Sequence, residues 1–416
     1  MELKKRNSGI ELLRIISMIS IMVLHIMGQG GVIENLSVGG PQYFTAWALE
    51  IICFFGVTTY GIISGFVGVD AHYRVTNIIY TWLQVFFYTI IITTLFYFFV
   101  PEVVHGSAFL SACFPVFTEQ YWYFSAYFGV FFLMPVLNFA IKNMDRRMIN
   151  ITFGFFLTAF SVCPVIFSTD IFALREGYSF GWLLAAYFFG AYAKKFDIFK
   201  KIKSINLLLI FCLATALTYA FKVVCDLVIG KGGDRLVQYN SPTVLLASLA
   251  LVCLFSRIDI KNKMGKLILA AGPLTFGVYL INCQPLVWKY LMKDRFISYA
   301  DLNPALMVIR VLLVALEIFF IGIAVDALRR LLFEVIGLRR RLNSLNDMIM
   351  RRKCPCCGMG RVDKFEICEV CGWENDPVQA KDPGFRGGAN KESLNEYRAK
   401  YLEGINSESA NEDKDI

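Results

Sequence analysis

The sequence predicts an all-α polytopic membrane protein with ten transmembrane helices, cytoplasmic N- and C-termini, and a small zinc-ribbon-like module at the C-terminus. Of its 416 residues, 56% are hydrophobic and 18% are charged, whereas soluble domains average about 45–50% and about 25%. The mean hydropathy is +0.55. The apolar residues occur in long uncharged runs, which excludes a soluble enzyme, and five cysteines crowd into residues 354–371.

Ten stretches meet or approach the length of about 20 apolar residues that a bilayer-crossing helix needs. The sixth and eighth are short, and charge or proline interrupts the seventh and ninth. The first is a true span, because Arg14 and His25 lie inside it and no small-residue cleavage site follows, unlike a signal peptide. The stretches are 10–28, 43–69, 78–100, 120–141, 150–168, 179–193, 205–229, 241–256, 267–291 and 304–328.

The positions of lysine and arginine predict the orientation, because cytoplasmic loops carry an excess of these residues. Eighteen of them lie at the N-terminus and in alternate loops, against five in the remaining loops. Residues 1–338 hold 27 Lys+Arg and 19 Asp+Glu, and residues 339–416 hold 14 of each. The basic residues form no single stripe, so no nucleic-acid partner is expected. The multi-pass domain is expected in the cell membrane, with the C-terminal module in the cytoplasm.

Arg14 and His25 are ionisable residues inside the first span, where such groups are costly and mark function by default. Eleven positions at about 100° each place both side chains on one helix face, about 16 Å apart along the axis. Arg14 could bind an anionic acyl donor or stabilise an oxyanion, and His25 could act as a general base toward a hydroxyl. In the alternative interpretation, Arg14 extends to the headgroups and His25 is a hydrogen-bonded core histidine.

Three further charged sites lie in the spans. Glu50 could line the same space as His25, or could be a protonated carboxyl bonded to a neighbouring helix. Two sets are expected to be structural ion pairs, since their members share a helix face: Lys222 with Asp226, and Arg310 with Glu317.

Residues 6–330 resemble the acyltransferase family 3 of integral membrane proteins. The resemblance rests on Arg14 and His25 with the same spacing and on four short motifs in the same order, namely Ile63-Ser64-Gly65-Phe66, Tyr121-Trp122-Tyr123-Phe124 with Leu133-Met134-Pro135, Gly190-Ala191-Tyr192 and Thr275-Phe276-Gly277-Val278-Tyr279-Leu280-Ile281. It implies acyl transfer, usually of acetyl, from cytoplasmic acyl-CoA to a hydroxyl of a cell-surface glycan or a lipid-linked saccharide. It also implies catalytic roles for His25 and Arg14, with Glu50 as a further candidate.

The sequence departs from the family pattern at two places. The last motif usually ends Leu-Ile-His, whereas this chain has Leu280-Ile281-Asn282, and asparagine cannot take a proton at neutral pH. The segment before the third span is often rich in basic residues for the CoA phosphates, and here Arg74 is the candidate. Arg74 could equally be an ordinary cytoplasmic-side arginine.

Glu119, Tyr121 and Trp122 are candidate acceptor-binding residues at the outer end of the fourth span. Aromatic rings at this depth are commonly interfacial anchors, but they could also stack on a sugar.

Four cysteines have the spacing of a tetrahedral zinc site: Cys354, Cys357, Cys368 and Cys371. They form two Cys-x2-Cys-Gly knuckles, and Cys356 is left over. A reducing cytoplasm disfavours disulfides, and iron could use the same ligands. Because four protein ligands leave no position for water, the site is expected to be structural.

Residues 354–401 also resemble the cysteine-rich CPCC domain. The resemblance rests on three segments, namely Cys-Pro-Cys-Cys-Gly at the start, residues 371–379 and residues 386–395. The predicted domains are therefore an acyltransferase domain (1–330), a basic linker facing anionic membrane lipid (331–353), a zinc module (354–403) with an unknown protein partner, and a disordered acidic tail (404–416).

The leading interpretation is a membrane O-acyltransferase that uses acyl-CoA, most often acetyl-CoA. An exporter or flippase without transferase activity is the alternative. A scaffold merely anchored by its membrane part does not explain ten spans.

Overall fold

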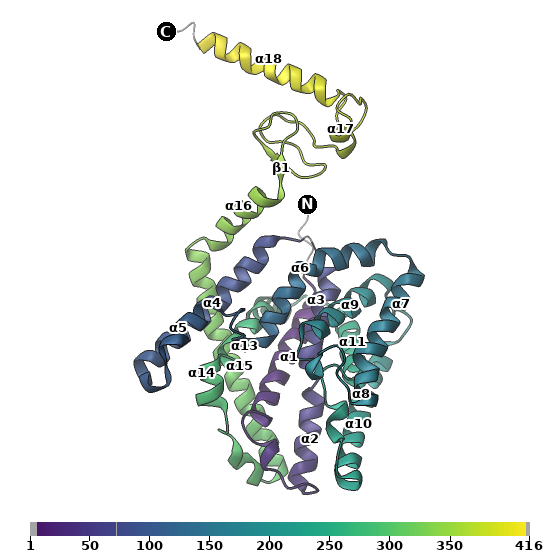
Figure 1. The fold of residues 1–416 in the computed structure, drawn as a ribbon, viewed down its shortest axis with the longest axis vertical. Coiled ribbons are helices and arrows are strands. Elements are labelled where there is room, and N and C mark those ends of the chain that lie inside the picture. The colour runs from purple at the N-terminus through teal and green to yellow at the C-terminus, as the bar shows by residue number, and fades with distance from the viewer. Residues whose placement is uncertain (1–5, 72, 413–416) are drawn as a thin grey trace. The chain divides into compact units, whose positions relative to one another are not determined.

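The computed structural model describes residues 6–71 and 73–412. The chain divides into two compact units (Figure 1). The membrane unit comprises Met1–Tyr73 and Thr81–Leu331, and the C-terminal unit comprises Arg74–Tyr80 and Leu332–Ile416.

The membrane unit is built from helices, and two of them, α4 (Val75–Phe99) and α15 (Pro304–Val335), have an end in the C-terminal unit. The other α-helices are α1 (Ser8–Met27), α2 (Pro41–Cys53), α3 (Gly56–Gly68), α5 (Gly106–Cys113), α6 (Trp122–Asn143), α7 (Arg146–Phe156), α8 (Cys163–Phe167), α9 (Phe180–Phe196), α10 (Ser204–Val224), α11 (Pro242–Ser256), α12 (Lys263–Ala271), α13 (Thr275–Asn282) and α14 (Pro285–Val287). Short 3-10 or π segments are η1 (Ile33–Asn35), η2 (Pro101–Val103), η3 (Leu157–Val162), η4 (Arg175–Gly177), η5 (Cys225–Ile229), η6 (Gly233–Leu236), η7 (Gly272–Leu274), η8 (Trp288–Met292) and η9 (Ile297–Asp301).

Within the described residues, eight helical stretches are long and apolar enough to cross a membrane. Each overlaps one of the predicted spans, but the helical stretch at the ninth ends at Asn282, whereas the prediction continued to residue 291. The two remaining predicted spans are also helical, but α9 has 17 residues and α11 has 15. The protein is therefore a helical multi-pass membrane protein. The number of ten spans and the cytoplasmic termini stay predictions.

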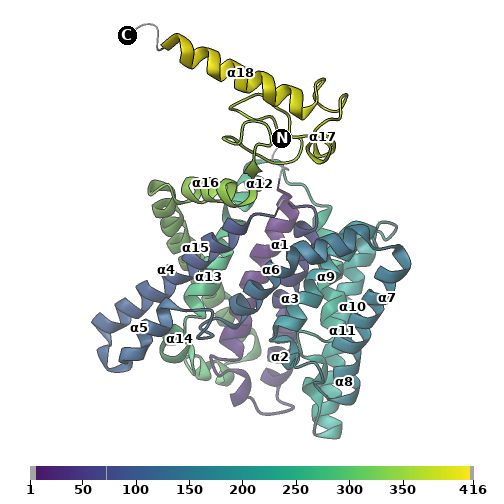
Figure 2. The same ribbon diagram turned by 45° about the horizontal axis from the view of Figure 1, so that its top comes forward.

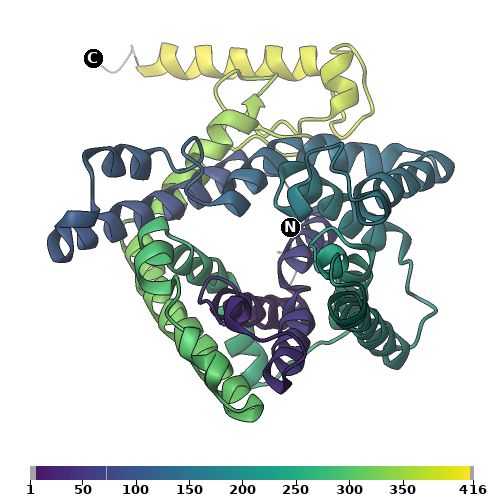
Figure 3. The ribbon, with the colours of Figure 1, turned by 60° about the horizontal axis from the view of Figure 1, so that its bottom comes forward.

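The central helix of the membrane unit is α1, which contacts α2, α3, α11, α12 and α13. Figure 2 shows it running between α3 and the helices that follow α12. In Figure 3 the green helices of the membrane unit and its teal helices lie on opposite sides of the purple α1. Its start is fixed by Asn7, whose side chain accepts a hydrogen bond from the backbone N–H of Ile10 at 2.8 Å, a typical N-cap. Arg14 and His25 are thus presented at the centre of the unit.

Two of the short motifs are contact points between α3 and α9. A Cβ on Gly65 would lie 1.8 Å from the backbone oxygen of Tyr187, and one on Gly190 would lie 1.9 Å from that of Ile62. No side chain fits at such distances, so each glycine lets the two backbones touch, as small residues do between membrane helices. These motifs hold the scaffold together.

The charged residues predicted inside the spans differ in whether they form ion pairs. Lys222 pairs with Asp226 at 2.9 Å, as predicted, and also with Asp234 at 2.6 Å. The predicted pairing of Arg310 with Glu317 is wrong: both side chains are exposed on α15 and the structure has no ion pair between them. That helix uses a different pair, Asp326 and Arg329, which is buried.

In the C-terminal unit the end of α15 is followed by the helix α16 (Leu338–Met350), so most of the predicted linker 331–353 is helical. The ring of Tyr80 lies 5.7 Å from that of Phe333. The strands β1 (Arg352–Lys353) and β2 (Arg361–Val362) pair antiparallel, with Arg352 opposite Val362. Two helices follow, α17 (Pro377–Lys381) and α18 (Leu394–Glu412). The predicted disordered tail 404–416 is helical as far as Glu412, and residues 413–416 lie outside the described residues.

Candidate functional site

His25 lies near the C-terminal end of α1 and faces the break between α13 and α14. Its Nδ1 is 2.5 Å from Oδ1 of Asn282, and its Nε2 is 3.9 Å from Sγ of Cys283. The ring of Trp288 meets the imidazole edge-on, with centroids 4.7 Å apart. An amide oxygen can only accept a hydrogen bond, so Nδ1 of His25 is the donor. The neutral imidazole therefore carries its lone pair on Nε2.

The break that places Asn282 and Cys283 is set by the sequence after α13. Pro285 has no N–H to continue the preceding helix. Gln284 is buried, and its side-chain oxygen accepts hydrogen bonds from the N–H groups of Leu286 at 2.7 Å and Val287 at 3.2 Å. This cap starts α14 in a new direction and leaves Cys283 as the last residue of the preceding turn.

Arg14 belongs to a charged cluster near the start of α1. Its Nη1 lies 3.2 Å from Oε1 of Glu11, and Nη2 of Arg6 lies 2.8 Å from the same oxygen. Tyr60 donates a hydrogen bond to the backbone oxygen of Arg14 at 2.8 Å and lies 2.9 Å from Oγ1 of Thr275. Two guanidinium groups share one carboxylate, so the cluster keeps a net positive charge. The Arg14 side chain is 24% exposed and can meet an anion.

Two other predicted site residues, Arg74 and Glu50, take part in none of the hydrogen bonds and ion pairs given above. Arg74 is exposed and begins the stretch Arg74–Tyr80 of the C-terminal unit, and its role in donor binding stays a prediction. Glu50 is buried on α2, and its Oε2 has no hydrogen-bond partner among the described residues.

The predicted acceptor residues fall into three different settings. Glu119 is exposed in the loop before α6. Tyr121 is 1% exposed and donates a hydrogen bond to the backbone oxygen of Leu280 at 2.8 Å, so it ties α6 to α13. Trp122 packs against Tyr178 with ring centroids 4.8 Å apart. Of the three, Trp122 is the one that packs against a residue lining an open pocket, Tyr178.

This pocket, called here the loop pocket, lies between residues 164–178 and 235–240 and has a volume of about 570 Å³. Arg175, Arg235 and Gln238 line it, together with Tyr178 and Asn240. Asn240 is 1% exposed; its Nδ2 donates to the backbone oxygen of Phe160 at 3.1 Å, while its Oδ1 has no partner among the described residues. The size is that of ordinary small-molecule sites.

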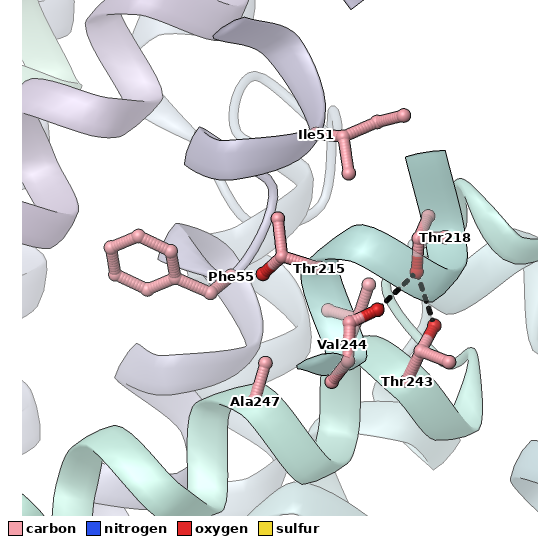
Figure 4. A pocket seen from close by; sticks show the side chains of 8 residues that line it. Ile51, Phe55, Thr215, Thr218, Thr243, Val244 and Ala247 are labelled. Atoms are coloured by element: carbon pink, nitrogen blue, oxygen red, sulfur yellow. Dashed lines mark hydrogen bonds between the residues drawn. The ribbon is translucent and has the colours of Figure 1, made fainter. Parts of the chain in front are cut away.

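A second cavity, between α2, α10 and α11, is far smaller (Figure 4). Its volume is about 10 Å³, room for about one water molecule. Thr218 lies at its wall and donates hydrogen bonds to the backbone oxygen of Ala214 at 3.1 Å and to Thr243 at 2.7 Å. The cavity is too small to hold a substrate.

The four predicted metal ligands meet at one point of the C-terminal unit. All their sulfurs lie within 4.8 Å of one another, with Cys354 and Cys371 3.6 Å apart and Cys357 and Cys368 3.7 Å apart. A tetrahedral zinc site with bonds of about 2.3 Å has sulfur–sulfur edges of about 3.8 Å. The spacing therefore fits a four-coordinate metal ion. Cys356 is outside this group and is buried in the module core with Trp373.

The backbone around the cysteines prepares them to bind a cation. Gly358 and Gly372 have φ of 69° and 74°, a conformation that glycine adopts without strain. Burial opposes ionisation of Cys357, but the N–H groups of Gly360 and Met359 lower its pKa to about 7. Burial raises the pKa of Cys354 to about 12, so a cation is needed before both are thiolates together.

Comparison with family models finds two matches. Residues 7–325 match the acyltransferase domain. The chain belongs to the acyltransferase family 3. Residues 352–413 match the cysteine-rich CPCC family. Comparison with curated proteins and with solved structures gives no significant match.

In this membrane acyltransferase, Arg14 and His25 contact residues that the sequence pattern did not assign to the candidate site. Glu11 stands three residues before Arg14, a spacing that favours ion pairs on a helix and could have indicated it. Tyr60, Cys283 and Trp288 carry no comparable local signal, because they reach α1 through tertiary packing. Asn282, noted only as a departure from the family pattern, is the direct partner of the acyltransferase's His25.

Proposed function

We propose that this acyltransferase moves an acyl group, most often acetyl, from cytoplasmic acyl-CoA to a hydroxyl of a cell-surface glycan or lipid-linked saccharide. The observation that carries the proposal is the hydrogen bond from His25 to Asn282, because it leaves Nε2 of His25 as a proton acceptor. The acceptor hydroxyl oxygen attacks the thioester carbonyl and its proton passes to Nε2. The carbon–sulfur bond then breaks, and the CoA thiolate takes that proton from the imidazolium.

Arg14 suits the anionic end of the donor. It lies about 16 Å along α1 from His25, too far for its guanidinium to touch an oxyanion formed beside the imidazole. The net positive cluster of Arg6, Arg14 and Glu11 favours the CoA phosphates. The extended pantetheine arm of the donor would then run along α1 toward His25.

The acceptor fits the loop pocket. Planar side chains such as Gln238, Asn240 and Arg235 can bond neighbouring sugar hydroxyls, and the 44% exposed Tyr178 offers a ring to stack against. Tyr178 also packs against Trp122, a predicted acceptor residue, with ring centroids 4.8 Å apart. An acceptor bound here would present its hydroxyl to Nε2 of His25 from this side.

The C-terminal module would hold a structural Zn²⁺ at Cys354, Cys357, Cys368 and Cys371 on the cytoplasmic side. The donor set supports this, since four thiolates close the coordination shell and favour zinc. The basic residues at 339–341 and 351–353 would lie against anionic lipid of the cell membrane.

The test is His25→Ala in cells, with mass analysis of surface and lipid-linked glycans. The wild type should carry a mass increment of ~42 Da per transferred acetyl group, the difference that acyl transfer to a hydroxyl implies. His25→Ala should lose it while membrane insertion is retained. His105→Ala, which changes an exposed histidine outside the site, should keep it. Undiminished acylation in His25→Ala contradicts the base assignment, and loss of the glycan itself from the surface favours an exporter.

A further inference from the structure

Cys283, His25 and Asn282 have the arrangement of a nucleophile, its base and the group that orients the base. The sulfur of Cys283 is 3.9 Å from Nε2 of His25, and Oδ1 of Asn282 holds Nδ1 at 2.5 Å. Nucleophilic catalysis by cysteine needs these three parts in this order. Direct transfer to a sugar needs the histidine alone, so the thiol facing the free nitrogen is unexplained by it.

Accessibility agrees with a reactive thiol. Cys283 and His25 are both partly exposed, so a substrate can reach them. Three other cysteines of the unit, Cys113, Cys163 and Cys212, are also partly or fully exposed, but none of them has a hydrogen bond to a histidine among the described residues. Cys283 also lies at the end of α13, where the break held by Gln284 keeps its side chain beside the imidazole. Among the described residues, no disulfide partner engages it.

We propose that Cys283 forms a covalent acyl-thioester intermediate during transfer. This inference rests on the proposed acyl transfer and adds a step to it. The sulfur of Cys283 attacks the thioester carbonyl of acyl-CoA while its proton passes to Nε2 of His25. The bond from the carbonyl carbon to the CoA sulfur breaks, and the leaving thiolate takes the proton from the imidazolium. The products are free CoA and an acyl group on Cys283.

The second half returns the enzyme to its starting state. The acceptor hydroxyl oxygen attacks the Cys283 thioester, and its proton passes to the same Nε2. The bond to Cys283 then breaks, and the thiolate regains its proton from His25. One thioester is exchanged for another in the first half, so no oxidant or energy source is needed. The intermediate allows CoA to leave before the acceptor arrives.

The experiment measures CoA exchange in the full-length protein in lipid nanodiscs, without any acceptor. Radiolabelled CoA is mixed with unlabelled acetyl-CoA, and label entering acetyl-CoA is followed. A covalent intermediate predicts exchange in the wild type and its loss, by a factor of about 100 or more, in Cys283→Ala. Cys253→Ala, which removes a buried cysteine elsewhere in the unit, should exchange like the wild type.

A second measurement identifies the bond. Acid-quenched wild-type protein incubated with [14C]acetyl-CoA should carry label on the peptide containing Cys283, and neutral hydroxylamine should release it as from a thioester. Two results would overturn the intermediate but leave the proposed function intact. In the first, the wild type acylates glycans in cells but shows no CoA exchange. In the second, Cys283→Ala acylates glycans at the wild-type rate. Absence of both glycan acylation and exchange in the wild type contradicts the proposed function as well.

Discussion

Oδ1 of Asn282 accepts a hydrogen bond from Nδ1 of His25 at 2.5 Å, across 257 positions of the chain. The amide of Asn282 cannot take up a proton at neutral pH, so this side chain cannot relay a proton. It can still orient the imidazole and select its tautomer.

Removal of this hydrogen bond should slow the reaction without weakening substrate binding. Asn282→Ala frees the imidazole to rotate and to protonate at either nitrogen, so kcat should fall about 10- to 100-fold. KM for acyl-CoA should stay the same. Asn282→Asp retains an accepting oxygen and should recover much of the loss. Steady-state kinetics with purified protein measure both parameters, and equal losses in both variants would assign a purely structural role to the position.

Arg14→Lys should be impaired in donor binding. Lysine keeps the charge but loses the planar group that can face Glu11 and a phosphate together. KM for acyl-CoA should rise about tenfold, with a smaller change in kcat, because Arg14 is remote from the reacting carbonyl. Isothermal titration with CoA gives an independent readout. Wild-type affinity in this variant would reduce Arg14 to a headgroup anchor.

Gln238→Ala should weaken acceptor use. Gln238 lines the loop pocket, and removal of one neutral hydrogen bond to a ligand costs about 0.5–1.5 kcal/mol. KM for a saccharide acceptor should rise about three- to tenfold, while KM for acetyl-CoA does not change. Lys231→Ala is the control, since Lys231 is exposed on the same loop and does not line the pocket. An unchanged acceptor KM in Gln238→Ala would place the acceptor elsewhere.

Chelation of the metal, or Cys368→Ser, should unfold the C-terminal module alone. The module core consists mainly of the cysteines with Trp373 and Val362, so loss of the ion removes most of what holds it. Tryptophan fluorescence and limited proteolysis should report cleavage within 354–401. Deletion of 342–416 should leave acyl transfer by the membrane unit in place. Complete loss of turnover in the inserted, truncated protein would show that the module takes part in donor binding.

Gly190→Ala should destabilise the membrane unit. The new Cβ would lie 1.9 Å from the backbone oxygen of Ile62, so α3 and α9 must move apart. We expect a cost of about 1–3 kcal/mol and a lower melting temperature in detergent. Gly154→Ala is the matched control, because nothing lies within 4 Å of its Cβ on the helix α7. There the higher helix propensity of alanine should leave stability unchanged or slightly higher.

Local pattern was enough to predict eight apolar helical spans, the helix that carries Arg14 and His25, and the cluster of four cysteines that could hold a metal ion. These features depend on residues a few positions apart, where helix period, ligand spacing and apolar run length act directly on the chain. Lys222 and Asp226 illustrate the same point: four residues apart on one helix, they pair as expected.

Tertiary structure alone decided what surrounds those residues. Glu11 could have been inferred as a partner of Arg14, but Asn282 and Cys283 meet His25 only because α13 ends beside α1. Tyr121 was expected at an acceptor site, whereas in the structure its hydroxyl donates a hydrogen bond to the backbone oxygen of Leu280. The physical reason is that contacts between distant segments depend on how backbones fit together, as at Gly65 and Gly190, and no sequence period encodes that fit.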